Sequence, residues 1–225
     1  MNASIHRVVA TAGLAACLVA RASWADEWPS ARLGDRAHWD AAYDAASAQR
    51  FIPTQLVVPG VWGGARTADS PPGNFIDGGG DRWSGPTDDA EPLTGRKILS
   101  YGRERTNRRE GTVVQRFALR EQGDGIGRIR DSRFGGLECA GEIKFPLGLW
   151  REGETRRNEY HCAIKGGPPE RRVNTITIEK IDFPCRGVPH CLQFTWTHES
   201  ERLGKLDDRR YVFAPGIGEF VAERR

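Results

Sequence analysis

Four cysteines and three histidines in the second half of the chain carry its most distinctive chemistry. The cysteines are Cys139, Cys162, Cys185 and Cys191, and two of them follow a histidine directly, in His161-Cys162 and His190-Cys191. Thiolates beside imidazoles are typical ligands of zinc and related metals. An even number of cysteines is also typical of disulfide pairing in an oxidising compartment.

Disulfide pairing is the interpretation that we favour for these cysteines. Adjacent residues of a strand point to opposite faces, so a His-Cys pair does not readily offer both side chains to one ion. The segment 184–191, Pro-Cys-Arg-Gly-Val-Pro-His-Cys, has the composition of a turn between two strands. We therefore expect Cys185 to pair with Cys191, which leaves Cys139 and Cys162 for each other; a metal site is the alternative.

The histidines give the competing functional hypothesis, an envelope hydrolase or metal-dependent enzyme. If the strands pair consecutively, His161, His190 and His198 converge near Trp196. The catalytic templates are absent, because the sequence has no G-x-S-x-G, H-E-x-x-H or P-loop. Calcium is a further alternative, since six carboxylates fall within 23 residues, but their spacing matches no calcium loop: Asp69, Asp77, Asp81, Asp88, Asp89 and Glu91. We expect no catalytic residue and no cofactor.

The first 25 residues have the three parts of a secretory signal. Arg7 gives a positive start, Val8–Ala20 is an apolar stretch of 13 residues, and Ser23-Trp24-Ala25 has the small-x-small pattern of a cleavage site. We therefore expect cleavage after Ala25 and a periplasmic or secreted protein. The alternative is a lipoprotein anchored through Cys17, because Leu-Ala-Ala-Cys at 14–17 resembles a lipobox.

Removal of residues 1–25 leaves 200 residues, enough for a single β-rich domain over 26–225. Arg7 and Arg21 leave with the signal, so 31 basic residues face 30 acidic ones. This balance argues against a nucleic-acid partner. No later stretch reaches 18 apolar residues, so we expect no membrane span. Arginine outnumbers lysine 28 to 5, which we attribute to genome composition more readily than to anion recognition.

The N-terminal half is expected to hold one helix, one strand and a long flap. Helical spacing of apolar residues after Asp35 predicts a helix over 36–49. Residues 51–58 predict an edge strand that contains Pro53. Residues 59–92 are rich in glycine and proline, yet they carry Trp62, Phe75 and Trp83, so we expect an ordered flap. With Trp196, these aromatic residues are the predicted ligand contacts.

From residue 97 onward the sequence predicts short strands separated by turns. The connections are too short for crossover helices, so we expect an antiparallel meander that forms a curved sheet or half-barrel. The predicted strands are Lys97–Arg105, Gly111–Arg120, Ile126–Arg133, Leu137–Phe145, Thr155–Ile164, Val173–Phe183, Leu192–His198, Arg209–Ala214 and Glu219–Glu223.

The C-terminal segment 211–218, Tyr-Val-Phe-Ala-Pro-Gly-Ile-Gly, has the pattern Y-x-[YF]-[AS]-P-G-x-G. It resembles the closing strand–turn–strand of uncharacterised exported β proteins of Gram-negative bacteria. The resemblance implies a curved antiparallel sheet, similar to lipoprotein-carrier-like half-barrels, and it brings no catalytic residues. The function expected from the sequence is a non-enzymatic periplasmic module whose concave sheet binds an apolar small molecule, a lipid or an envelope protein. A structural accessory of a surface assembly is a further alternative.

Overall fold

The computed structural model describes residues 43–58, 75–76, 80–107, 109–133, 135–214 and 218–225. In these residues a 12-stranded sheet has the order β15-β14-β13-β12-β11-β8-β7-β6-β5-β4-β3, and β9 pairs with β7 outside that path. All the paired strands are antiparallel. Sequence order and spatial order agree except where β9 and β10 leave the path, so the predicted antiparallel meander is confirmed.

The strands of the main sheet have the following bounds: β3 Phe75–Ile76, β4 Arg82–Ala90, β5 Lys97–Thr106, β6 Val113–Gln122, β7 Gly125–Asp131, β8 Leu137–Ala140, β9 Phe145–Pro146, β11 Thr155–Ile164, β12 Glu170–Cys185, β13 Val188–Ser200, β14 Gly204–Ala214 and β15 Gly218–Arg224. A smaller sheet joins β1 Tyr43–Asp44, β2 Gln49–Ile52 and β10 Gly148–Trp150. The helix α2 is a single turn, Thr54–Val57.

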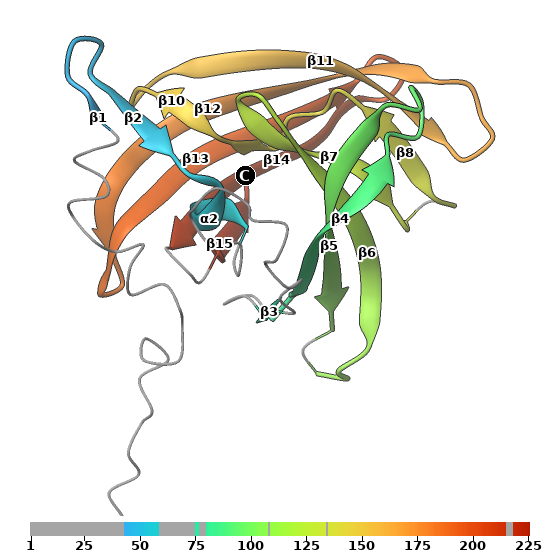
Figure 1. Ribbon diagram of the computed structural model, residues 1–225, viewed down its shortest axis with the longest axis horizontal. Helices are drawn as coiled ribbons and strands as arrows, with labels where there is room; N and C mark the ends of the chain where they lie inside the picture. The colour runs from blue at the N-terminus through green and yellow to red at the C-terminus, as the bar shows by residue number, and fades with distance from the viewer. Residues whose placement is uncertain (1–42, 59–74, 77–79, 108, 134, 215–217) are drawn as a thin grey trace, which may run out of the picture.

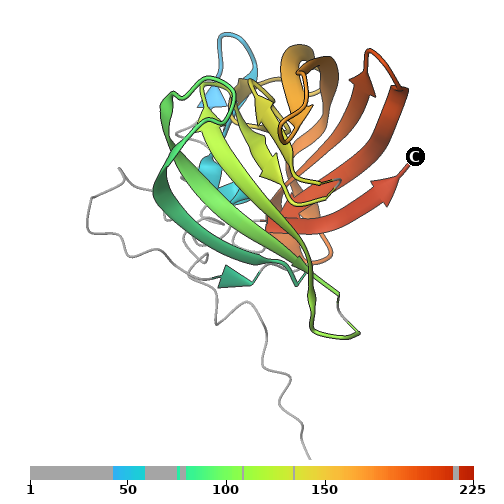
Figure 2. The same ribbon diagram turned by 90° about the vertical axis from the view of Figure 1, so that its right-hand side faces the viewer.

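The large sheet curls into a half-barrel, and α2 and β10 fill one end of its concave side. Figures 1 and 2 show the sheet arching over α2, with β2 and β10 beside it. Leu56 and Val57 of α2 and Trp150 of β10 belong to the same buried cluster as Phe194 and Phe213 of the sheet. Full burial of one such side chain contributes roughly 1.5–3 kcal/mol. The interior of the half-barrel is therefore a hydrophobic core at this end.

The predicted helix over 36–49 is wrong in the part that the structure describes. Tyr43–Asp44 and Gln49–Ile52 are strands, and residues 45–48 form the turn between them. The carboxylate of Asp44 accepts hydrogen bonds from the backbone N–H of Ala46 (3.1 Å) and from the hydroxyl of Ser47. These local bonds favour a turn over a helix. Residues 36–42 lie outside the described range.

The predicted strand over 51–58 is also corrected, since only Phe51 and Ile52 of this range belong to a strand and α2 follows. Pro53 precedes this helix at its N-cap position, where the missing N–H of proline costs no hydrogen bond.

The predicted flap over 59–92 contains strands in its C-terminal part. Phe75–Ile76 is β3 and Arg82–Ala90 is β4, which pairs with β5. Gly85 and Pro86 lie where the register shifts between Ser84 and Thr87, so this pair marks a bulge within a strand. Residues 59–74 and 77–79 are outside the described part of the chain.

Both disulfides have the pairing favoured from the sequence. Cys139 and Cys162 face each other across β8 and β11, and their sulfurs are bonded. Cys185 and Cys191 close the turn between β12 and β13. Two disulfides indicate an oxidising, extracytoplasmic environment.

Candidate ligand-binding cavity

The open end of the half-barrel holds a cavity of about 420 Å³ on the concave face. Phe117 and Trp196, which line it, belong to the same core cluster as Leu56 and Val57 of α2, and this shared cluster places the cavity on the side that α2 covers. Its walls come from strands β5 to β8 and β11 to β15. The cavity is therefore the part of the half-barrel interior that α2 and β10 leave unfilled.

The cavity combines apolar and positively charged walls. The apolar side chains are Phe117, Leu137, Ile164, Trp196, Leu203 and Leu206. The cations are Arg105, Arg128, Arg133, Lys144, Arg172, Arg202, Arg209 and Arg224, against the two acids Asp131 and Asp207. Ile164 and Leu203 are 48% and 61% exposed, so the apolar surface continues to solvent. Such a surface suits an amphiphilic ligand.

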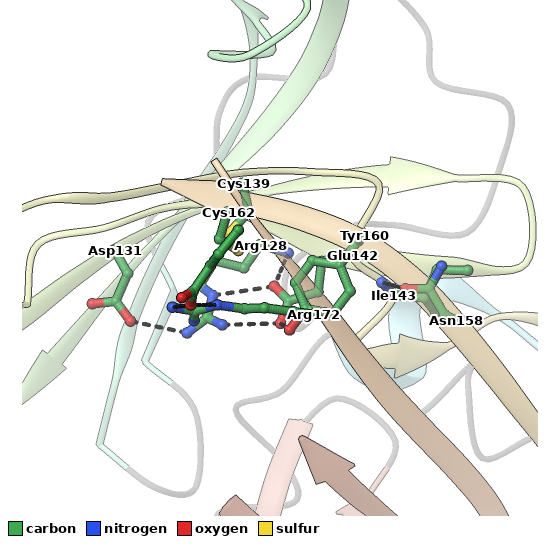
Figure 3. The surroundings of a disulfide bond; sticks show 10 residues. Arg128, Asp131, Cys139, Glu142, Ile143, Asn158, Tyr160, Cys162 and Arg172 are labelled. Carbon is green, nitrogen blue, oxygen red and sulfur yellow. Dashed lines mark hydrogen bonds and ion pairs between the residues drawn. A yellow bond between two sulfur atoms is a disulfide. The ribbon is translucent and has the colours of Figure 1, made fainter. Parts of the chain in front are cut away.

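Arg128 anchors one wall through a buried ion-pair network. Its guanidinium donates to both oxygens of Glu142, at 3.0 and 3.1 Å, and to Asp131 at 3.1 Å. The hydroxyl of Tyr160 donates to Glu142 at 3.3 Å, beside the Cys139–Cys162 disulfide (Figure 3). A bidentate arginine–carboxylate pair fixes both side chains in one geometry. Arg128 is therefore fixed in position and has two carboxylates as partners.

The segment between β8 and β9 brings Glu142 and Lys144 over the sheet, where a continuous strand over 137–145 was predicted. Gly127 permits this approach, because a Cβ at that position would lie 1.6 Å from the carbonyl oxygen of Glu142. The backbone N–H of Lys144 donates to the carbonyl of Ile126 at 2.8 Å. The next residue back, Ile143, donates its N–H to Asn158 at 2.8 Å (Figure 3). The segment is thus fastened to the sheet on both sides of the cavity floor.

Lys144 places its amine among aromatic rings at the cavity floor. The Nζ atom lies 5.1 Å from the ring centroid of Trp196, 5.4 Å from that of Phe145 and 5.7 Å from that of Phe117. Burial, together with the charge of Arg128, lowers the pKa of Lys144 to about 7. Within the described residues its amine forms no ion pair with a carboxylate. Lys144 is therefore a partly exposed cation that lies among aromatic rings and neighbouring guanidinium groups.

His198 lies in the same wall and remains neutral. Its ring stacks on Tyr160 with centroids 6.0 Å apart and lies 5.1 Å from the ring of Trp196. Burial and the nearby charge of Arg128 lower the pKa of His198 to about 2. In the described part of the chain, His198 Nε2 and Trp196 Nε1 are buried without a hydrogen-bond partner.

The predicted histidine cluster does not form. His161 is exposed on β11, on the opposite face from Tyr160, and His190 pairs with Asp182 near the β12–β13 turn. Only His198 reaches the cavity. Over the described ranges, no three His, Cys, Asp or Glu side chains are grouped to hold a metal ion.

The acidic residues proposed as calcium ligands have other roles. Asp81, Asp89 and Glu91 form ion pairs with Arg103, Arg130 and Arg120, and Asp88 is exposed on β4. Asp69 and Asp77 lie outside the described residues.

Of the four predicted ligand contacts, the structure places one in the cavity. Trp196 lines it, whereas Trp83 is 2% exposed in the core, with the Arg103 guanidinium 4.9 Å from its ring. Phe75 lies in β3, but its side chain is outside the described set, as is the whole of Trp62. The sequence reasoning missed Lys144 and the arginines. The arginines could have been found from their strand positions, because a residue two before a buried one points to the same face; Arg209, two residues before the buried Tyr211, is an example.

Fold and cavity together define a curled antiparallel half-barrel with an amphipathic pocket. Comparisons with protein-family models, with curated proteins and with solved structures found no match for this chain. None of the described helices has the length and apolar character that a bilayer crossing requires.

Proposed function

We propose that this protein is a non-enzymatic binding module of the cell envelope whose concave cavity holds an apolar or amphiphilic ligand. The observation that carries the proposal is a cavity of about 420 Å³ with both apolar and cationic walls. The volume falls within the roughly 300–1,000 Å³ that is typical of small-molecule sites, and the lining is richer in charged side chains than is usual for them.

The mouth of the cavity supports an apolar ligand portion. Ile164, at the end of β11, and Leu203, in the turn between β13 and β14, both line the cavity and are both exposed. Exposed apolar side chains at the rim of a pocket favour contact with a ligand or partner. The aromatic rings of Phe117 and Trp196 extend this apolar surface inward.

The proposed location is the periplasm or the extracellular space. The signal-like residues 1–25 and the two disulfides support it. N-terminal sequencing of the protein from its native host should begin at Asp26. A lipid-modified N-terminus at Cys17 would instead place the module on a membrane surface.

Titration with a neutral apolar dye, N-phenyl-1-naphthylamine, tests the binding function. We expect saturable binding that Leu203→Asp weakens about tenfold, because the change removes an apolar contact and the bound dye would displace water from the new carboxylate. Val114→Asp is the matched control, since Val114 is 54% exposed on β6 and does not line the cavity. Absence of saturable binding, or equal effects of the two substitutions, would refute the proposal.

A further inference from the structure

We propose that the ligand carries one anionic head group, a carboxylate or a phosphate, and that Lys144 binds this group at the floor of the cavity. The inference rests on the proposed binding function and adds the chemical class of the ligand and its orientation. The head group would lie inside, next to Lys144, and the apolar chain would extend outward to Ile164 and Leu203.

Charge pairing points to Lys144 among the cations of the cavity. All seven arginines of the lining lie within 4.0 Å of a carboxylate oxygen: Arg105, Arg128, Arg133, Arg172, Arg202, Arg209 and Arg224. Each lining arginine thus has an acidic partner, although Asp131, Glu170 and Asp207 are each shared by two arginines, and among the described residues Lys144 is the lining cation without one.

The surroundings of Lys144 make an unpaired ammonium costly. Cation–π contacts with the rings of Phe117, Phe145, Trp196 and Tyr211 offset part of the cost of removing the ammonium from water, but they supply no opposite charge. The guanidinium groups of Arg103, Arg105 and Arg128 raise the cost further through repulsion. A bound anion offsets both terms, because it pairs with Lys144 in a region of low dielectric.

Among the described residues, the wall beside Lys144 also contains an indole N–H that has no acceptor. Trp196 Nε1 is a donor only, and within the described residues it has no acceptor. Among the described rings, that of Trp196 is the nearest to Lys144 Nζ. The proposal requires the oxygen-rich head group to reach this buried indole N–H as well as the ammonium.

Affinity for the anion should depend on pH, because the neutral amine of Lys144 does not attract it. The charged or titratable groups that face Lys144 are Arg103 and Arg105 on β5, Arg128 on β7, Glu142, His198 on β13, Tyr211 on β14 and Glu219 on β15. Burial raises the pKa of Tyr211, and His198 stays neutral, so neither changes charge between pH 6 and 9. Over that range Lys144 is the group in this set whose loss of a proton weakens anion binding.

Calorimetric titration of the mature protein with dodecanoate, dodecyl phosphate and uncharged dodecanol tests the inference. At pH 6.5 we expect at least one of the two anions to bind ten or more times tighter than dodecanol, and the tighter one identifies the head group. Lys144→Met should abolish this preference and leave dodecanol binding unchanged. Lys144→Arg should keep the preference and extend it to pH 9, where the native protein loses it. Lys97→Met, an exposed lysine on β5 outside the cavity, is the control and should change nothing.

The outcomes separate this inference from the binding function. Equal affinity for dodecanol and both anions, or an anion preference that survives in Lys144→Met, would overturn the role of Lys144 while the cavity remains a binding site. Failure of all three ligands and of the neutral dye to bind would remove the binding function itself.

Discussion

The guanidinium of Arg103 in β5 lies 2.6 Å from the carboxylate of Glu219 in β15, although seven strands separate β5 from β15 in the order of the sheet. Arg103 also contacts Asp81 at 2.7 Å, and Arg105 contacts both acids. The curl of the sheet brings its two edge regions together at this point. The four side chains form a buried clasp across the half-barrel.

We predict that Glu219→Gln destabilises the protein by about 1–3 kcal/mol, because it leaves the buried Arg103 with a weaker acceptor. Asp81 remains as a partner, so the loss should stay below that of a fully broken buried ion pair. Chemical denaturation at pH 7 measures the change. Arg116→Gln removes an exposed ion pair with Glu104 and should alter stability by less than about 1 kcal/mol.

The same clasp predicts acid sensitivity. Although burial opposes ionisation, the charges of Arg103 and Arg105 hold the pKa of Glu219 below its usual 4.5. Its contribution to stability is therefore complete above pH 4.5 and is lost as the pH falls through the lower folded-state value. The stability difference between the native protein and Glu219→Gln should shrink over this acidic range. A difference that stays constant down to pH 2 would contradict the assignment.

The fold was largely predictable from sequence because alternating patterns fix strands locally. In β12 and β13, Ile176, Ile178, Phe194 and Trp196 are buried and mark the inner face, as their spacing predicts. Strand β4 was missed because Gly85 and Pro86 mark a loop as readily as a bulge. The cavity was harder to predict, since Lys144 reaches it from an irregular segment and contacts the rings of Phe117, Trp196 and Tyr211 from three other parts of the chain. No local pattern encodes that convergence.

We predict that intact-mass measurement will show four hydrogens fewer than the reduced chain, two for each disulfide. Replacement of both Cys139 and Cys162 by alanine should cost about 2–4 kcal/mol. The same change at Cys185 and Cys191 should cost less, because that bond closes a sequence separation of 6 residues compared with 23. Denaturant unfolding of the two double variants gives the comparison, and the reverse order would contradict it.

Trp83→Ala should destabilise the protein by about 3–5 kcal/mol, since truncation of a buried tryptophan leaves a cavity in the core. Truncation of a tryptophan that only contacts a ligand would cost much less stability and would weaken dye binding instead. Phe51→Ala, at a position 42% exposed in β2, is the control and should change stability by less than about 1 kcal/mol. Thermal unfolding distinguishes the two roles, and a small loss for Trp83→Ala would favour the ligand contact that the sequence predicts for Trp83.

The last prediction is that Lys144→Met stabilises the folded protein near neutral pH. The pKa of Lys144 falls from its usual 10.5 to about 7 on folding, so between these values the unfolded chain holds more protons on this group than the folded chain does. Stability of the native protein should therefore rise with pH from 7 to 10, and this part of the rise should vanish in Lys144→Met. Methionine fills similar space among the rings of Phe145 and Trp196 without a charge to desolvate. If Lys144 served mainly in packing, Lys144→Met would lower the stability of the folded protein, because the core would be weakened. Thermal unfolding of both proteins at pH 7 and pH 10 decides between the two. A lower melting temperature for Lys144→Met at pH 7 would mean that Lys144 supports the fold, and the case for an anion at this position would lose its energetic argument.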